Sequence, residues 1–219
     1  MSSASQIPVQ SEAQEDYFFF FALPRKLNMD VSALDESFYA LSRKLHPDLY
    51  AKASSEEQAW SLQQSSRLND AYRTLKDPIR RTQYLLQLEG VELEEQSKAA
   101  TEQARSSGQA KKQIVPPDLL EEVFELNMQL EELKANKKLG EDDPALIEEV
   151  GRQKLELEEK YEALLDELRS YWTKWDELIE RGSAPDADRK QILEKMIDVL
   201  NRRNYIRNLV RDVSEVLEQ

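Results

Sequence analysis

An all-α fold is predicted by the composition of the chain and by the spacing of its apolar residues. The 219 residues include only 5 glycines, and a content of 33% charged and 40% hydrophobic residues is typical of a water-soluble helical protein and too apolar for a disordered one. In several long segments apolar residues recur at intervals of three and four, the period of a helix. Four consecutive phenylalanines at 18–21 also fit a buried strand, but no segment offers a partner strand, so we expect a helix there.

Four helices are predicted in residues 16–90, each bounded by a capping residue, a proline or a glycine. The expected bounds are a first helix from Asp16 to before Pro24, a second from Asp30 to Pro47, a third from Ser55 to Lys76 and a fourth from Asp77-Pro78 to Gly90. The apolar residues expected on their faces are Tyr17, Phe20 and Phe21 in the first, Leu34, Phe38, Leu41 and Leu45 in the second, and Tyr84, Leu85 and Leu88 in the fourth.

Residues 118–219 are predicted to form an antiparallel three-helix bundle. Asp118 with Glu121 fits a capping box at its start, and Gly140 and Gly182 are turn signals that fold the chain back. The second helix is expected to begin at Asp143-Pro144 and the third near Pro185. Each helix carries an apolar stripe at intervals of three and four residues. The stripe of the first helix is Leu119, Val123, Leu126, Leu130 and Leu133; that of the second is Leu157, Tyr161, Leu164, Leu168, Tyr171, Trp175 and Leu178; and that of the third is Ile192, Met196, Val199, Ile206, Val210, Val213 and Leu217, with a polar break at Arg203.

The remaining segments are interpreted as connections. Residues 1–15 are expected to be a disordered tail, and residues 91–117, which are rich in Glu, Gln, Ser, Ala and Lys and lack aromatics, a linker. The net charge of −13 is uneven, because most of the excess negative charge falls after residue 90. This asymmetry predicts two modules, at 16–90 and 118–219, with different partners.

Composition also limits the chemistry. The absence of cysteine excludes disulfides, thiolate catalysis and cysteine zinc sites, and a single histidine leaves little for a transition metal, although carboxylate-only Mg²⁺ or Ca²⁺ binding stays open. We therefore expect no metal and no cofactor.

The net charge and the lack of a long apolar segment limit the partners. The negative charge argues against binding to nucleic acid and to anionic membranes, and the longest apolar run, YFFFFAL, is too short to cross a bilayer. The N-terminal residues resemble neither a secretory signal nor a transit peptide, so a cytoplasmic protein is expected.

The only histidine, His46, lies before Pro47 and Asp48 in the stretch RKLHPDLY, where a helix is predicted to stop. Proline forbids continuation of the helix, and Arg43 and Lys44 in its last turn complement the helix dipole and remain available to an acidic partner. Taken alone, the tripeptide fits a plain helix stop with a solvated basic face. His46 and Asp48 as an acid/base pair would make an enzyme, but no nucleophile motif or phosphate loop accompanies them.

The order short helix, helix, His-Pro-Asp loop, helix resembles the J-domain of DnaJ-type co-chaperones. The segments DYFFFFALP, RKLHPD and LNDAYRTLKDPIRRTQYLL carry this resemblance in the right order. It implies docking on a DnaK-type chaperone and stimulation of its ATPase. It also implies that the chaperone-binding residues are Arg43, Lys44, His46, Pro47 and Asp48. Asp35 and Glu36, early in the same helix, leave its basic patch thin.

A J-domain followed by an acidic three-helix bundle resembles HscB-type co-chaperones, on the segments PIRRTQYLLQLEG and LLEEVFELNMQLEEL. The resemblance implies a protein that is not itself an enzyme and that delivers the iron–sulfur cluster scaffold protein (IscU-like) to a DnaK-type, HscA-like chaperone. The linker and the second bundle helix look longer than usual in that family. The cysteine-rich extension of some eukaryotic members is absent, which favours a bacterial-type protein without zinc.

A second apolar row on the first bundle helix points to a client surface. Leu120, Phe124 and Met128 are spaced four apart beside a complete core stripe, and Tyr205 likewise lies off its own stripe. A wide core face that includes Phe124 is the alternative. The family resemblance assigns scaffold binding to Leu120, Phe124, Glu125, Met128, Glu132 and Tyr205, although Met128 takes a place that is usually acidic. Two further hypotheses stay open: a J-domain adaptor with a different client, and a structural coiled-coil adaptor.

Overall fold

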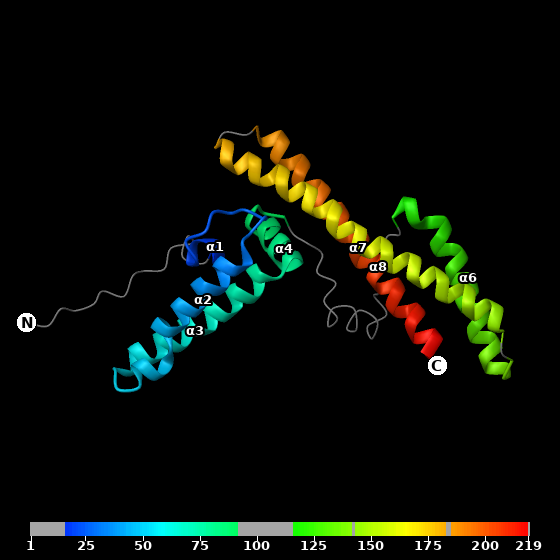
Figure 1. Ribbon diagram of the computed structural model, residues 1–219, viewed down its shortest axis with the longest axis horizontal. Coiled ribbons are helices and arrows are strands. Elements are labelled where there is room, and N and C mark those ends of the chain that lie inside the picture. The colour runs from blue at the N-terminus through cyan, green and yellow to red at the C-terminus, as the bar shows by residue number, and fades with distance from the viewer. Residues whose placement is uncertain (1–15, 92–115, 142, 183–184, 219) are drawn as a thin grey trace, which may run out of the picture. The chain divides into compact units, whose positions relative to one another are not determined.

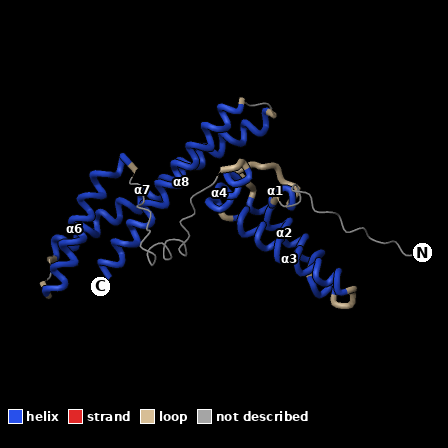
Figure 2. The backbone as a smooth tube through the Cα atoms, turned by 180° about the vertical axis from the view of Figure 1, so that it is seen from behind, coloured by secondary structure: helices blue, strands red, loops and turns tan. Residues whose placement is uncertain are grey.

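The computed structural model describes residues 16–91, 116–141, 143–182 and 185–218, and every regular element within them is a helix (Figures 1 and 2). The predicted all-α fold is confirmed. The elements are α1 (Tyr17–Phe20), α2 (Val31–Leu45), the 3-10 helix η2 (Pro47–Tyr50), α3 (Ser55–Lys76), α4 (Pro78–Leu88), the 3-10 helix η3 (Pro117–Leu119), α6 (Leu120–Leu139), α7 (Pro144–Arg181) and α8 (Asp186–Glu218). The expected tail and nearly all of the expected linker lie outside the described residues. None of the described helices combines the length and apolar character needed to span a membrane.

The capping residues read from the sequence begin the N-terminal helices. The Asp16 carboxylate accepts the Phe18 amide at 2.8 Å, and Asp30 and Asp77 accept amides of the first turns of α2 and α4. At the start of α3, Ser54 and Glu57 form a reciprocal capping box. Each cap satisfies amide groups that the helix itself leaves without a partner, which is why these bounds follow from local sequence.

Two of the predicted helix faces and one predicted cap were wrong in part. In α1 the buried side chain is Phe18, and Phe21 just after the helix is buried as predicted. Tyr17 and Phe20 are only partly buried, and Tyr17 stacks on Tyr84 with ring centroids 4.6 Å apart. The α8 stripe was partly misread: its buried residues are Leu193, Met196, Val199, Leu200, Tyr205, Ile206, Leu209, Val213 and Val216. Asp118 does not cap α6, because a 3-10 turn at Pro117 precedes that helix and the Asp118 carboxylate instead accepts from Arg202 of α8 at 2.7 Å.

By their contacts the residues fall into two compact units, and the first unites residues 1–93 with residues 172–189. In it α2 and α3 lie side by side as a hairpin, with α1 and α4 against α3 (Figure 1). Apolar side chains from all of these segments form its core, which holds Phe18, Leu27, Leu34, Leu68, Leu75, Leu85, Leu86 and Trp175. The end of α7 and the start of α8 thus belong, by their contacts, with the N-terminal helices.

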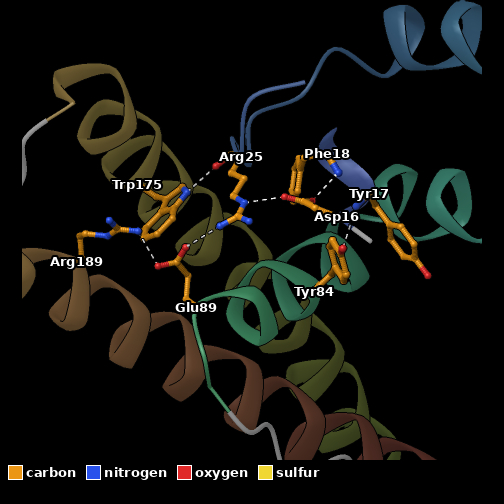
Figure 3. A network of polar contacts seen from close by, with 8 residues as sticks. All are labelled: Asp16, Tyr17, Phe18, Arg25, Tyr84, Glu89, Trp175 and Arg189. Atoms are coloured by element: carbon orange, nitrogen blue, oxygen red, sulfur yellow. Dashed lines mark hydrogen bonds and ion pairs between the residues drawn. The ribbon is translucent and has the colours of Figure 1, made fainter. Parts of the chain in front are cut away.

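Buried polar contacts attach the end of α7 to the loop after α1. The Trp175 indole Nε1 donates to the Arg25 carbonyl at 2.9 Å, and the Asp176 carboxylate accepts the backbone amides of Leu27 and Asn28 at 2.7 and 2.8 Å. A chain of ion pairs continues from Asp16 through Arg25 and Glu89 to Arg189, with distances of 2.8, 3.8 and 2.7 Å (Figure 3).

Replacing Asp176 by alanine is expected to lower the free energy of unfolding of this unit by about 2 kcal/mol, because one buried and one partly buried amide lose a charged acceptor. All three tryptophans of the chain, Trp60, Trp172 and Trp175, lie in this unit, so urea unfolding followed by tryptophan fluorescence reports on it. Glu177→Ala removes the neighbouring exposed carboxylate on the same helix and in the same unit, so it is the matched control and should leave the transition nearly unchanged. Equal transitions for the two variants would contradict the prediction.

The second unit unites residues 94–171 with residues 190–219. Helix α6 buries Val123, Leu126, Leu130 and Leu133, as its predicted stripe requires. It ends at Gly140, whose φ of +71° is cheap only for glycine, and the chain then reverses into α7. The polar break in α8 has a partner, since the Arg203 guanidinium lies 3.7 Å from the ring centroid of Tyr161 in α7.

Candidate functional site

The His-Pro-Asp corner forms where α2 gives way to η2. His46 has extended backbone angles, φ −62° and ψ 130°, which is the conformation that a following proline favours. Pro47 then opens the 3-10 turn, and the Leu49 amide closes it on the His46 carbonyl at 3.0 Å. The sequence signal for a helix stop is therefore met by a short, hydrogen-bonded turn.

The side chains of this corner face solvent. The His46 side chain is 55% exposed and that of Asp48 is 89% exposed, while Arg43 and Lys44 lie exposed in the last turn of α2. Pro47 is half-buried. All five predicted residues thus lie together, and no side chain of the described residues encloses His46 or Asp48. A second protein can approach them.

The imidazole is oriented by its neighbour in the chain. His46 Nδ1 accepts the Asp48 amide at 3.3 Å, so the neutral ring carries its proton on Nε2. A protonated ring would instead donate from Nδ1 to the Asp48 carboxylate, whose oxygen lies 3.4 Å away. In either state a hydrogen bond between the two residues fixes the orientation of the imidazole relative to Asp48.

The loop is anchored to α3 by residues that we did not single out from the sequence. Tyr50 packs edge-to-face on Trp60, with ring centroids 5.8 Å apart, and the Gln58 amide donates to the Ala53 carbonyl at 3.0 Å. Ser61 and Ser65 of α3 both donate to the Leu45 carbonyl at the end of α2. The only sequence signal for the serines is their spacing of four, which puts both on one face of α3.

Asp35, one of the two acidic residues that thin the basic patch of α2, is paired with residues of α3. The Asp35 carboxylate accepts from the Lys76 ammonium at 3.1 Å and from the Tyr72 hydroxyl at 2.9 Å. These hydrogen bonds, Lys76 first and Tyr72 second, hold the pKa of Asp35 below its usual value. The cations Arg43 and Lys44 are therefore opposed by less negative charge than the sequence suggests.

The second apolar row on α6 is exposed. Leu120, Phe124 and Met128 are 58%, 66% and 59% exposed, whereas the core stripe of the same helix is buried. The alternative that Phe124 belongs to the bundle core is thereby excluded. Glu125 and Glu132 are exposed on the same helix. Three large apolar side chains in a row on a solvent-exposed helix face are typical of a surface that binds a partner.

Tyr205 differs from this row. We expected it at a partner surface, but its exposed fraction is only 8%, so it contributes to the core of the second unit. Burial, together with the nearby charge of Asp212, raises the pKa of its phenol. The exposed row is thus carried by α6 alone. Among the described residues, no group of three or more His, Asp or Glu side chains is arranged to hold a metal ion.

Comparison with known proteins finds co-chaperones. No protein-family model matches the sequence. A co-chaperone protein HscB homolog of Vibrio cholerae is 46% identical over 78 residues, which is 36% of this chain and 46% of that protein. One from Cupriavidus taiwanensis is 31% identical over 155 residues, 71% of this chain and 80% of that protein. The match thus spans about half the length of the Vibrio cholerae relative and four fifths of the second.

Two solved structures have the same fold. Chaperone HscB from Vibrio cholerae superposes with a TM-score of 0.61 at 26% identity, covering 93% of this chain and 99% of that one. The human co-chaperone protein HscB superposes with a TM-score of 0.58 at 23% identity, covering 94% and 83%. The second likeness concerns the fold alone.

Proposed function

The chain belongs to the HscB family of co-chaperones, and from this premise we propose that it docks on a DnaK-type, HscA-like chaperone, stimulates the ATPase of that chaperone, and delivers an iron–sulfur cluster scaffold protein to it. The observation that carries the proposal is the exposed His46-Pro47-Asp48 corner, which follows two exposed cations, Arg43 and Lys44. In this role the chain hydrolyses nothing itself. It biases the nucleotide cycle of its partner.

Docking is supported by the charge and the stiffness of the corner. Arg43 and Lys44 at the C-terminal end of α2 favour an acidic surface and speed the encounter with it, an effect that is screened by salt. The 3-10 turn and its anchors on α3 hold the imidazole and the Asp48 carboxylate in one arrangement before binding. Less ordering entropy is then lost when the complex forms.

Scaffold delivery is supported by the row of Leu120, Phe124 and Met128. These side chains already stand out from the bundle, so a client that covers them gains apolar burial without rearranging the core. Glu125 and Glu132 on the same helix suit a client with basic groups around an apolar contact. In this proposal residues 16–90 are the J-domain and residues 118–219 the client-binding module, of which residues 172–189 make their contacts with the N-terminal helices.

One titration tests both partners. The full chain is added to a DnaK-type chaperone with and without the scaffold protein, and steady-state ATP turnover is measured. We expect stimulation by the chain alone and a larger stimulation when the scaffold is also present, because the chain then brings client and chaperone together. No response of the ATPase under either condition would reject the co-chaperone function and favour a structural adaptor.

A different client is a second candidate because Tyr205 is buried. One of the apolar residues that the family resemblance assigned to the scaffold contact is then not on the surface. If the chain stimulates the ATPase but the scaffold adds nothing, and a pulldown recovers another client that needs Leu120 and Phe124, this second candidate is favoured.

A further inference from the structure

The last carbonyl of α2 lacks its normal helical partner. In a continuing helix the Leu45 carbonyl would accept the amide of Leu49, but that amide bonds instead to the carbonyl of His46 at 3.0 Å. Pro47 has no amide hydrogen to offer. Because the His-Pro-Asp turn diverts the backbone, the end of α2 depends on donors from elsewhere in the fold.

Two serines of α3 supply those donors. The Ser61 hydroxyl donates to the Leu45 carbonyl at 2.7 Å and the Ser65 hydroxyl at 2.8 Å, so both lone pairs of that oxygen are used. Ser61 is fully buried and Ser65 partly so. The residue that they hold is the one immediately before His46.

These two hydrogen bonds differ from those of two other hydroxyls in the described helices. Hydroxyls inside helices commonly bond to the carbonyl four residues earlier in the same helix. Thr82 and Ser214 do so here, at 2.8 Å each. Ser61 and Ser65 instead reach across to another helix, and both reach the same atom. These two hydrogen bonds therefore link α3 to the end of α2, where the loop begins.

We propose that Ser61 and Ser65 are positioning residues for the His46-Pro47-Asp48 loop, so that stimulation of the partner ATPase depends on two hydroxyls that never touch the partner. The assignment rests on the proposed function. By fixing where α2 ends, the pair fixes the direction in which His46 and Asp48 leave the surface. Loss of the hydroxyls leaves the Leu45 carbonyl free to seek the Leu49 amide, and the 3-10 turn then loses its closing bond.

The effect should stay local. Other contacts also join α2 and α3: Phe38 stacks on Tyr72 at 4.1 Å, and Asp35 accepts from Tyr72 and Lys76. Leu34 of α2 and Leu68 of α3 are both buried in the core of the unit. None of these contacts involves the serines. Replacing each serine by alanine removes a single oxygen and slightly raises helix propensity, so α2 and α3 are expected to persist while the loop loosens.

The experiment uses the full chain with Ser61→Ala, Ser65→Ala and the double variant, beside wild type and His46→Gln. Ser66→Ala, at the exposed neighbouring position of α3, is the matched control, and Ser65→Thr retains the hydroxyl as a rescue. Maximal ATPase stimulation and the chaperone concentration for half of it are measured together. Hydrogen–deuterium exchange of the Asp48 and Leu49 amides reports on the loop.

We expect maximal stimulation to fall roughly five-fold per lost hydroxyl, the change that one hydrogen bond of ordinary net strength produces. The half-maximal concentration should stay near that of wild type, because Arg43 and Lys44 are untouched. Exchange should quicken at Asp48 and Leu49 alone. Ser66→Ala and Ser65→Thr should match wild type in all three measurements.

The contrary outcomes are distinct. If wild type stimulates and the double variant does so equally, with unchanged exchange at Asp48 and Leu49, the positioning role is overturned while the proposed function stands. If exchange quickens equally throughout α2 and α3, the serines are general stability contacts and the positioning role is again overturned. If wild type itself gives no stimulation, the proposed function is wrong and the serines have no such role.

Discussion

His46→Gln is expected to abolish stimulation of the DnaK-type ATPase, by at least about ten-fold in maximal turnover, without loss of helix content. Glutamine keeps a polar side chain but removes the ring whose Nδ1 accepts the Asp48 amide, so the hydrogen bond that fixes the orientation of the imidazole relative to Asp48 is lost. The His46 side chain is 55% exposed and lies after the last turn of α2, so stability should change by less than about 0.5 kcal/mol. Steady-state ATP turnover measures the first effect, and far-ultraviolet circular dichroism with thermal unfolding measures the second.

A matched substitution separates the loop from general surface charge. Arg80→Gln removes an exposed cation from α4 and should leave stimulation at the wild-type level. Arg43→Gln and Lys44→Gln should raise the chaperone concentration needed for half-maximal stimulation, and more so at low salt. Normal stimulation by His46→Gln would mean that the corner is only a helix stop, and the proposed mechanism would then be wrong.

Local patterns predicted the helices because their ends are decided by residues close in sequence. Asp16, Asp30 and Asp77 each accept amides two or three residues further on, and Ser54 with Glu57 closes over a single turn. A cap of this kind has no competing partner far away in the chain. The same reasoning placed the exposed row on α6, since four-residue spacing fixes the side of a helix on which a residue lies.

The errors arose where a distant partner competes with a local one. Asp118 has the spacing of a cap, but Arg202, 84 residues away, takes its carboxylate. Asp176 was not singled out from the sequence, yet its carboxylate accepts amides about 150 residues earlier in the chain. Tyr205 lies off its stripe but is buried, because α8 presents a wide apolar face to its neighbours. The spacing of apolar residues along the sequence does not predict such contacts between distant residues. Ser61 and Ser65 were missed for the same reason.

Replacing Leu120, Phe124 and Met128 together by alanine is expected to weaken binding of the scaffold protein by at least about ten-fold. Each residue is more than half exposed, so the variant loses contact area in the complex but little of the bundle core. Tyr205 is left unchanged, because truncating a side chain that is 8% exposed would open a cavity and confuse binding with folding. The dissociation constant is measured by calorimetry, and the unfolding transition of the variant should match that of wild type.

Leu155→Ala provides the control for this surface. Leu155 is as exposed as the three residues of the row, at 60%, but lies on α7, so general loss of surface apolarity is tested without touching the row. The triple variant should still stimulate the ATPase when no scaffold is present, since the His46-Pro47-Asp48 corner is intact, and should lose only the added stimulation that the scaffold brings. Equal scaffold binding by the triple variant and wild type would reject the row as the client surface, whereas weaker binding by Leu155→Ala as well would extend that surface onto α7.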